Sequence, residues 1–177
     1  SLGEYAALAA SGRLSLEDTV RLVELRARLM QDACEKQPGA MSAVLGLDAE
    51  SIQRCLDVEG LSDTVIIANR NAPLQSVIAG PPADVEQAAA LLQQAGARRV
   101  ARLPVSGAFH TRYMAEAGEA LRAAFADLAL LPNGPGTVYS NVYASSLPEA
   151  LAIESDPSLS AYLERHMTRP VRWVEEI

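Results

Sequence analysis

SLGEY, residues 1–5, is the stretch that decides the fold. It is typical of the second half of a Gly-x-Ser-x-Gly nucleophile elbow, in which a serine stands on a sharp turn between a strand and a helix. The turn lifts the serine hydroxyl out of the sheet and brings the next backbone N–H, that of Leu2, close to a developing oxyanion. We expect Gly3 to pack tightly under the turn and residues 4–10 to continue as a helix.

A chain that begins at its nucleophile predicts a fragment whose preceding strand is missing. Taken alone, the motif is weak, because Ser1 could equally be an ordinary terminal residue. The remaining sequence therefore has to decide between these two interpretations.

Composition limits the classes of function. The 177 residues suffice for one domain or one and a half, and 49% of them are hydrophobic, enough for a substantial core. The net charge of −7 and the pI of about 4.8 argue against a general nucleic-acid binder, which would carry a basic surface. One basic cluster, Arg98, Arg99 and Arg102, is either a docking patch for an acidic partner or a solvated strand end.

The two cysteines, Cys34 and Cys55, have neither Cys-x-x-Cys spacing nor metal-ligand spacing to a histidine. They are typical of reduced, buried thiols in a cytoplasmic protein. No apolar stretch is long enough to span a membrane, and no signal peptide is visible.

The first long helix is predicted from residue 16 to residue 35. Ser15 with Asp18 is typical of a helix N-cap, and apolar residues recur on a helical period behind it. Arg26 lies beside this apolar stripe. It is either a residue at the edge of the stripe whose charged end reaches solvent or a clamp for an anionic ligand.

A different pattern follows over residues 38–105. Strand and helix signals alternate as β-α-β-β-α-β, which is typical of a ferredoxin-like unit. The sequence therefore predicts an α/β protein in which a small ferredoxin-like subdomain, 38–105, is inserted into a larger hydrolase-like subdomain formed by 1–37 and 106–177. Within the insertion we expect a turn at 69–73, strands at 40–47, 64–69, 75–80 and 99–105, and helices from 48 to 58 and from about 81 to 95.

The last third of the chain returns to the larger subdomain. A glycine-containing junction precedes His110 and is followed by a helix predicted over about 112–128. Further on, we expect a loop at 131–136, a strand at 137–143, helices at 148–153 and 157–167, and the start of another helix at 169–173.

His110 and His166 are the only histidines. A lone histidine is often structural, but a serine hydrolase-type site needs a base that follows the nucleophile along the chain. His110 fits that place for Ser1. No acidic residue stands out as the partner that would orient its imidazole, so a backbone carbonyl could do so instead.

These motifs together resemble the malonyl-CoA:acyl-carrier-protein transacylases, the acyltransferases of fatty acid and polyketide synthesis. The family's Gly-His-Ser-Leu-Gly-Glu-Tyr is matched from its serine onward by residues 1–5. The other matches keep the family's order along the whole chain, with Thr111 for a serine and Arg169 for an asparagine or serine. They lie at residues 26–31 (RARLMQ), 39–46 (GAMSAVLG), 69–80 (NRNAPLQSVIAG), 107–111 (GAFHT) and 169–173 (RPVRW).

The resemblance implies roles for the reacting groups. Ser1 would carry the malonyl group as an ester, and His110 would be its base and later its acid. The family orients this histidine through a main-chain carbonyl at the position of His166, where many relatives carry glutamine. The oxyanion hole would use the N–H of Leu2 and one from an N-terminal Gln-Gly-Ser-Gln loop that this chain lacks.

The resemblance also implies how the substrate is held. The planar guanidinium of Arg26 would bind the free malonyl carboxylate in a bidentate manner, which lysine cannot copy. Met30 and Phe109 would line the acyl pocket, and a phenylalanine before the histidine matches the malonyl-type pattern.

The implied reaction is a ping-pong transfer from malonyl-CoA, through Ser1, to the phosphopantetheine thiol of an acyl carrier protein. It needs no metal and no bound cofactor, and it involves neither nucleic acid nor a membrane. The acidic carrier protein could contact the basic cluster of Arg98, Arg99 and Arg102.

Two other functions remain open from the sequence. A thioester hydrolase on the same scaffold would gain nothing from a buried cation, so Arg26 favours transfer. The other alternative is a non-catalytic fragment that docks on carrier protein.

We expect the parent protein to be an active transferase and the 177-residue chain alone to be nearly inactive, because a serine at a free chain end is loosely held. The sequence leaves open the fatty acid or polyketide pathway, and a discrete enzyme or a domain of a megasynthase.

Overall fold

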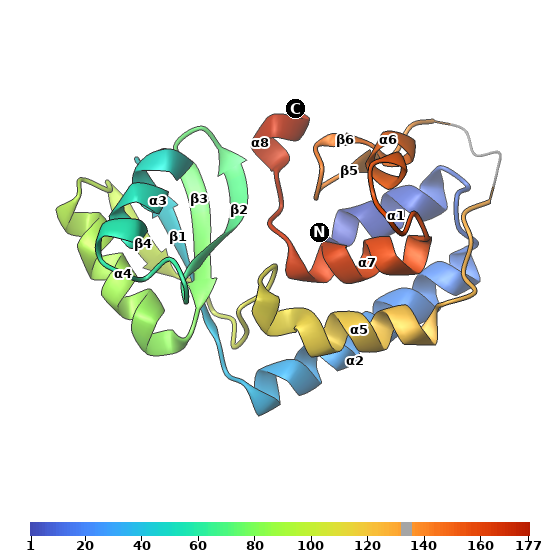
Figure 1. Cartoon of the computed structure of the whole chain (residues 1–177), viewed down its shortest axis with the longest axis horizontal. Helices are drawn as coiled ribbons and strands as arrows, with labels where there is room; N and C mark the ends of the chain where they lie inside the picture. Colours follow the sequence, from blue (N-terminus) through green and yellow to red (C-terminus); the bar gives the residue numbers. More distant parts are fainter. Residues whose placement is uncertain (132–135) are drawn as a thin grey trace.

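The computed structural model describes residues 1–131 and 136–177. Most of the loop expected at 131–136 therefore lies outside the described residues. Figure 1 shows an α/β arrangement with two lobes, a sheet lobe on one side and a helical lobe on the other, with the N-terminus between them. No described helix is long and apolar enough to cross a membrane.

The sheet lobe follows the β-α-β-β-α-β order expected from the sequence. Its four strands lie in the order β2-β3-β1-β4, and every neighbouring pair is antiparallel. Ala43 of the central strand pairs with Val77 on one side and Ala101 on the other. The elements are β1 (Ala40–Leu45), α3 (Ala49–Val58), β2 (Ile66–Ala72), β3 (Gln75–Gly80), α4 (Pro82–Gln94) and β4 (Arg99–Arg102).

The two faces of this sheet have different covers. One face packs against α3 and α4 through a fully buried cluster that includes Val44, Ile52 and Ile78. The opposite face carries Met41, Val77 and Ala79 and packs against the segment that follows β4. Successive residues of a strand point to opposite faces, so this apolar sequence buries both sides of the sheet.

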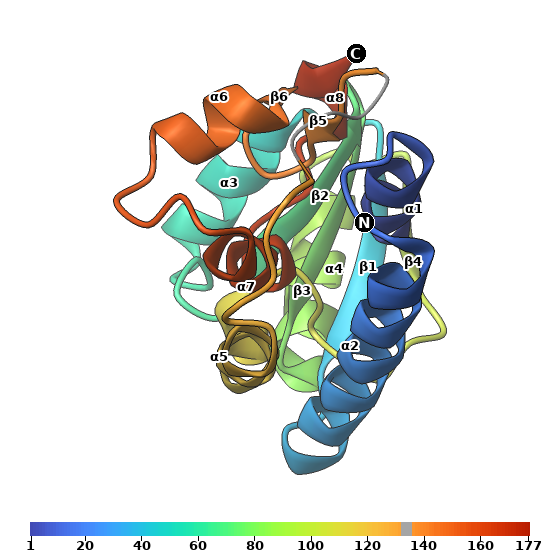
Figure 2. The same ribbon diagram turned by 90° about the vertical axis from the view of Figure 1, so that its right-hand side faces the viewer.

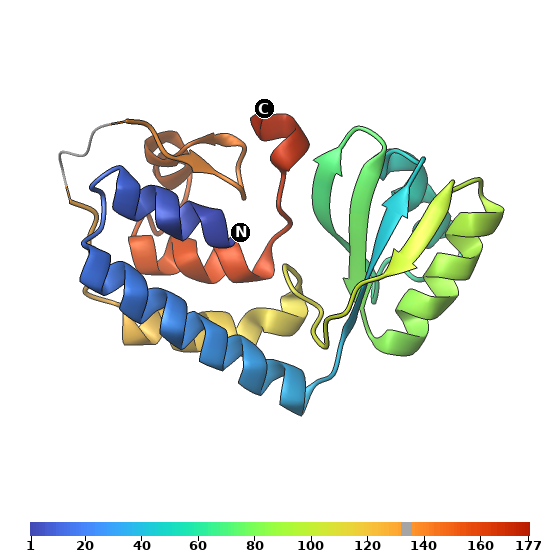
Figure 3. The ribbon, with the colours of Figure 1, turned by 180° about the vertical axis from the view of Figure 1, so that it is seen from behind.

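The helical lobe is formed by both ends of the chain (Figure 3). Figure 2 shows α5 and α7 of this lobe nearly end-on, with α1 and α2 to one side of them. Its elements are α1 (Leu2–Ala10), α2 (Leu16–Lys36), η1 (Arg112–Met114), α5 (Ala115–Ala124), β5 (Tyr139–Ser140), β6 (Ser145–Ser146), α6 (Leu147–Ala152), α7 (Leu159–Thr168) and α8 (Trp173–Glu176).

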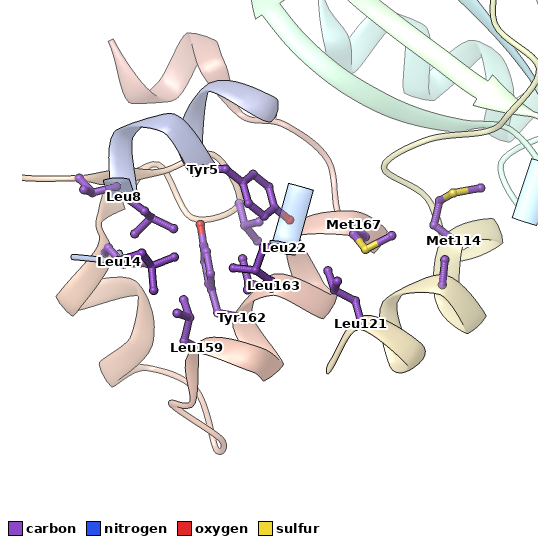
Figure 4. Close-up of a cluster of buried hydrophobic side chains, with 14 residues drawn as sticks. Tyr5, Leu8, Leu14, Leu22, Met114, Leu121, Leu159, Tyr162, Leu163 and Met167 are labelled. Carbon is purple, nitrogen blue, oxygen red and sulfur yellow. The ribbon is translucent and has the colours of Figure 1, made fainter. Parts of the chain in front are cut away.

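The core of this lobe combines α1, α2, α5 and α7. Figure 4 shows Leu8, Leu22 and Leu163 pointing toward one another, with the rings of Tyr5 and Tyr162 among them. All five side chains are at most 1% exposed. Residues that lie more than 150 positions apart in the sequence therefore share one core, which sets the positions of α1 and α7 relative to each other.

Three of the four strands of the sheet lobe have limits that differ from those expected. β1 ends at Leu45 because Gly46 turns the chain with φ of +95°. β4 ends at Arg102, and Pro104, which lacks an N–H, cannot continue the ladder. β2 extends to Ala72, so the turn expected at 69–73 is wrong, and the connection to β3 is only two residues long.

Two elements of the last third are shorter than expected. Of the strand expected at 137–143, only Tyr139 and Ser140 pair with another strand, because the Ser140 hydroxyl accepts from the N–H groups of Val142 and Tyr143 and holds a turn. The helix expected at 112–128 is a 3₁₀ turn followed by α5, which ends at Ala124.

Contacts between the lobes hold the N-terminal end of α1 beside the sheet. Asn69 of β2 forms a parallel bridge with Val171, and Arg70 Nη1 lies 2.8 Å from Glu175 Oε1 of α8. Where the chain first enters the sheet, Gly39 N donates to Ser106 O at 2.8 Å. A Cβ on Gly39 would lie 2.3 Å from the backbone N of Ala108, so only glycine fits there.

Candidate active site

Ser1 lies at the N-terminal end of α1, which faces the sheet lobe in Figure 3. Its hydroxyl accepts a hydrogen bond from Arg26 Nη2 of α2 at 3.1 Å. The close packing expected under the turn at Gly3 is not seen in the described part of the chain, since no atom beyond its chain neighbours and its own helix backbone lies within 4 Å of a Cβ built there. The backbone N–H of Leu2 lies at the start of the same helix, where unpaired N–H groups favour negative charge.

Arg26 is buried although it is always charged. It is 8% exposed, and its guanidinium carbon stands 5.3 Å from the centroid of the Tyr5 ring. Its Nε has no hydrogen-bond partner among the described residues. An unpaired donor on a buried cation is costly unless an acceptor or an anion reaches it.

His110 has the features of a residue held for function. Its φ is +60°, a backbone conformation that residues with a Cβ rarely adopt, and it is 6% exposed. Its Nδ1 lies 3.2 Å from the carbonyl oxygen of His166. A carbonyl can only accept, so Nδ1 carries the proton, and in the neutral ring Nε2 is left with a lone pair.

The surroundings of His110 favour its neutral form. Burial first, then the neighbouring His166 and Arg26, lower the pKa of His110 to about 3, against the bond to the His166 carbonyl, which raises it. A neutral imidazole can accept a proton throughout the physiological pH range.

The His166 carbonyl is available because of its place in α7. A helix leaves the C=O groups of its last four residues without partners inside the helix, and residue 166 is one of these. The imidazole rings of His110 and His166 are 6.1 Å apart and meet edge to face. No hydrogen bond joins Ser1 Oγ to the imidazole of His110 in the described part of the chain.

A cavity of about 720 Å³ opens beside Ser1, between the two lobes. Polar groups from β2 and from the segment around β5 line it, among them Asn69, Asn71 and Asn141. Arg26, Met30, Phe109 and His110 are absent from its lining.

The other candidates are spread around this centre. Met30 and Phe109 are half-buried and pack against the core of the helical lobe. Leu2 is 55% exposed, and its side chain lies on a shallow apolar groove between α1 and α2. The basic cluster of Arg98, Arg99 and Arg102 is fully exposed on or beside the edge strand β4. No group of three or more potential metal ligands occurs in the residues described.

Comparison with known proteins gives the family. Residues 1–177 match the family described as Acyl transferase domain. The chain belongs to this acyl transferase family. It is 39% identical, over its whole length, to the malonyl CoA-acyl carrier protein transacylase of Haemophilus influenzae, of which it covers 54%.

Solved structures of acyl transferases resemble it as a whole. The malonyl CoA-acyl carrier protein transacylase of Coxiella burnetii superposes with a TM-score of 0.87 at 33% identity, over 99% of this chain and 54% of that one. The structure of a type II PKS acyl-carrier protein in complex with its malonyl-transacylase matches with a TM-score of 0.85 at 34% identity. This match covers 98% of this chain and 54% of that one. The chain thus spans about half the length of the relatives it matches.

One part of the candidate site, the buried polar network behind Ser1 and His110, is not expected from the sequence. Glu4 accepts hydrogen bonds from Asn141 and Tyr162, and His166 lies beside it. A glutamate in an alanine-rich helix is usually exposed, and the partners of Glu4 come from distant segments of the chain. The only signal in the sequence is that Glu4 belongs to the motif at residues 1–5.

Proposed function

We propose that the protein transfers a malonyl group from malonyl-CoA to the phosphopantetheine thiol of an acyl carrier protein, through an ester on Ser1. The observation that carries this proposal is the contact of the buried Arg26 with Ser1 Oγ, with a further guanidinium donor left unpaired. A malonyl group on Oγ ends in a free carboxylate. The guanidinium of Arg26 is near enough to bind that carboxylate, and a neutral acyl chain would leave this cation unpaired.

In the first half-reaction, Ser1 Oγ attacks the thioester carbonyl carbon while His110 Nε2 takes its proton. The C–S bond then breaks, malonyl-Ser1 forms, and the CoA thiolate leaves with the proton from His110. The N–H of Leu2 is the oxyanion donor that this chain supplies. The His166 carbonyl keeps Nδ1 protonated, so that Nε2 is the basic nitrogen.

In the second half-reaction, His110 takes the proton of the phosphopantetheine thiol, and the sulfur attacks the ester carbonyl. The C–O bond to Ser1 breaks, and Oγ recovers the proton from His110. Between the two steps the ester has to be protected from water, and a site between two lobes suits this need.

We interpret the lobes as two subdomains. The sheet lobe, 38–105, has the strand order and antiparallel pairing of a ferredoxin-like unit. Residues 1–37 and 106–177 would belong to a hydrolase-like subdomain that carries the proposed reacting groups. For the carrier protein, we propose the exposed arginines 98, 99 and 102 as a contact surface, since carrier proteins are acidic.

The experiment is a transfer assay with full-length protein, malonyl-CoA and phosphopantetheinylated carrier protein. We expect malonyl-carrier protein to form, Ser1→Ala to abolish it, and His110→Ala to slow it about 10²–10⁴-fold, the usual contribution of a general base. Release of CoA without transfer would instead support the hydrolase. Binding of carrier protein without any CoA release would support the docking module.

A further inference from the structure

We infer that Glu4 is a positioning residue, which fixes α7 against α1 so that the His166 carbonyl faces His110. The inference concerns the geometry of the site, and its catalytic consequence rests on the proposed function. Glu4 touches neither Ser1 Oγ nor the imidazole of His110 in any described contact, so its effect would pass through α7.

Glu4 is a buried carboxylate one helical turn after Ser1. It is 5% exposed, and its Oε2 accepts from the backbone N and from Nδ2 of Asn141, at 3.0 and 2.6 Å. A charge at this depth is costly unless donors surround it. Burial by itself raises the pKa of Glu4, but the contacts with His166, Tyr162 and Asn141 together outweigh it and lower that pKa, so the carboxylate is ionised.

Glu4 holds α7 at two points. The Tyr162 hydroxyl donates to Glu4 Oε1, and in Figure 4 the Tyr162 hydroxyl is directed toward α1. His166 Nε2 lies 3.1 Å from Glu4 Oε2, a close polar contact outside hydrogen-bond geometry, and both side chains are almost fully buried. Residues 162 and 166 are four apart, on one face of the helix. Two contacts one turn apart fix both the rotation of α7 and its position along its axis.

The rotation of α7 decides where the His166 carbonyl points. That carbonyl lies 3.2 Å from His110 Nδ1, close to the limit of a hydrogen bond, so a small rotation would break the contact. Without it, either nitrogen of His110 could carry the proton, and Nε2 would no longer be reliably basic. Glu4 thus couples the helix of the nucleophile to the helix that orients the base.

The test compares Glu4→Gln with Glu86→Gln, a matched change at an exposed position of α4, in the full-length protein. We expect Glu4→Gln to lower the rate constant of Ser1 malonylation about 10- to 100-fold, a part of what general base catalysis contributes, with little change in the Kd of malonyl-CoA. Nitrogen-15 NMR of the His110 ring should show one Nδ1-protonated tautomer in the unaltered protein and a mixture in Glu4→Gln. Glu86→Gln should match the unaltered protein in both measurements.

Tyr162→Phe is the second variant, in case Glu4→Gln does not fold. It removes one of the two α7 contacts and should cause a smaller loss of the same kind. If neither variant changes the His110 tautomer, the inference is wrong. If the unaltered protein is not malonylated, the proposed function fails instead, and the NMR comparison still decides whether Glu4 positions α7.

Discussion

At the scale of single residues, the site depends on a few side chains whose environment contradicts their usual preference. Arg26 is a buried cation, Glu4 is a buried anion, and His110 has a positive φ. Each of these features costs free energy, so each needs either a compensating contact or a function. For Glu4 the contacts are present, whereas for Arg26 one donor has no partner among the described residues.

Gly39 gives a prediction at this scale. A methyl group there would meet the backbone of Ala108, which cannot move without displacing the segment that carries His110. We expect Gly39→Ala to lower the free energy of unfolding by about 1–3 kcal/mol, as overpacking usually does, and to reduce activity. Urea denaturation of the full-length protein measures this change.

Gly3→Ala is the matched control. No described atom lies within 4 Å of its Cβ, and alanine favours a helix over glycine by about 0.5–1 kcal/mol. The free energy of unfolding should stay constant or rise. Equal losses for the two variants would contradict the close approach at Gly39.

The residue scale also shows what the sequence can predict. Ser1, Arg26 and His110 could be singled out because each lies in a short motif whose chemistry is local. The network around Glu4 could not, because Glu4 and Tyr162 are 158 positions apart and meet only when α1 packs on α7. Long-range contacts between polar residues leave no periodic signal in a sequence.

At the scale of elements, the caps of the helices are reliable signals in this sequence. The helices expected after Ser15 and Asp48 begin where their caps place them. Strand ends were less reliable, because they depend on which neighbour is available for pairing. Residues 137–143 have the composition of a strand, yet the hydroxyl of Ser140 turns most of this segment away from pairing.

The cap of α2 gives the prediction at this scale. Ser15 Oγ accepts from Asp18 N at 3.0 Å, which satisfies one of the N–H groups that a helix start leaves free. Ser15→Ala should lower the free energy of unfolding by about 0.5–2 kcal/mol, whereas Ser15→Asp, which keeps an acceptor, should lower it less. Denaturant titration of the three proteins measures both changes. An equal loss in the two variants would contradict the capping role.

At the scale of the whole molecule, acid should weaken the fold. The fold lowers the pKa of His110 to about 3, whereas the ordinary value of 6.5 applies in the unfolded chain. The unfolded chain therefore holds more protons between these values, so stability falls as the pH drops from about 6.5, by at most about 1.4 kcal/mol per pH unit. The fold also lowers the pKa of Glu4 from its ordinary value of 4.5. Glu4 therefore adds a second loss of stability below pH 4.5.

The free energy of unfolding, measured by urea denaturation from pH 7 to pH 4, tests this expectation. His110→Gln should flatten the decline between pH 6.5 and 4.5 and leave the Glu4-dependent loss below 4.5 in place. The same slope in both proteins between pH 6.5 and 4.5 would show that His110 is not held neutral by the fold.

The central claim, that Arg26 makes Ser1 selective for a malonyl group, is tested most directly by intact mass. Full-length protein and its Arg26→Ala variant are incubated with malonyl-CoA or with acetyl-CoA. We expect a malonyl adduct on Ser1 and little acetyl adduct. Arg26→Ala should reduce malonyl adduct formation about 30-fold or more, since removing one partner of a buried charge pair costs about 2–5 kcal/mol. Equal malonyl and acetyl adducts, or a malonyl adduct that Arg26→Ala retains, would contradict the account.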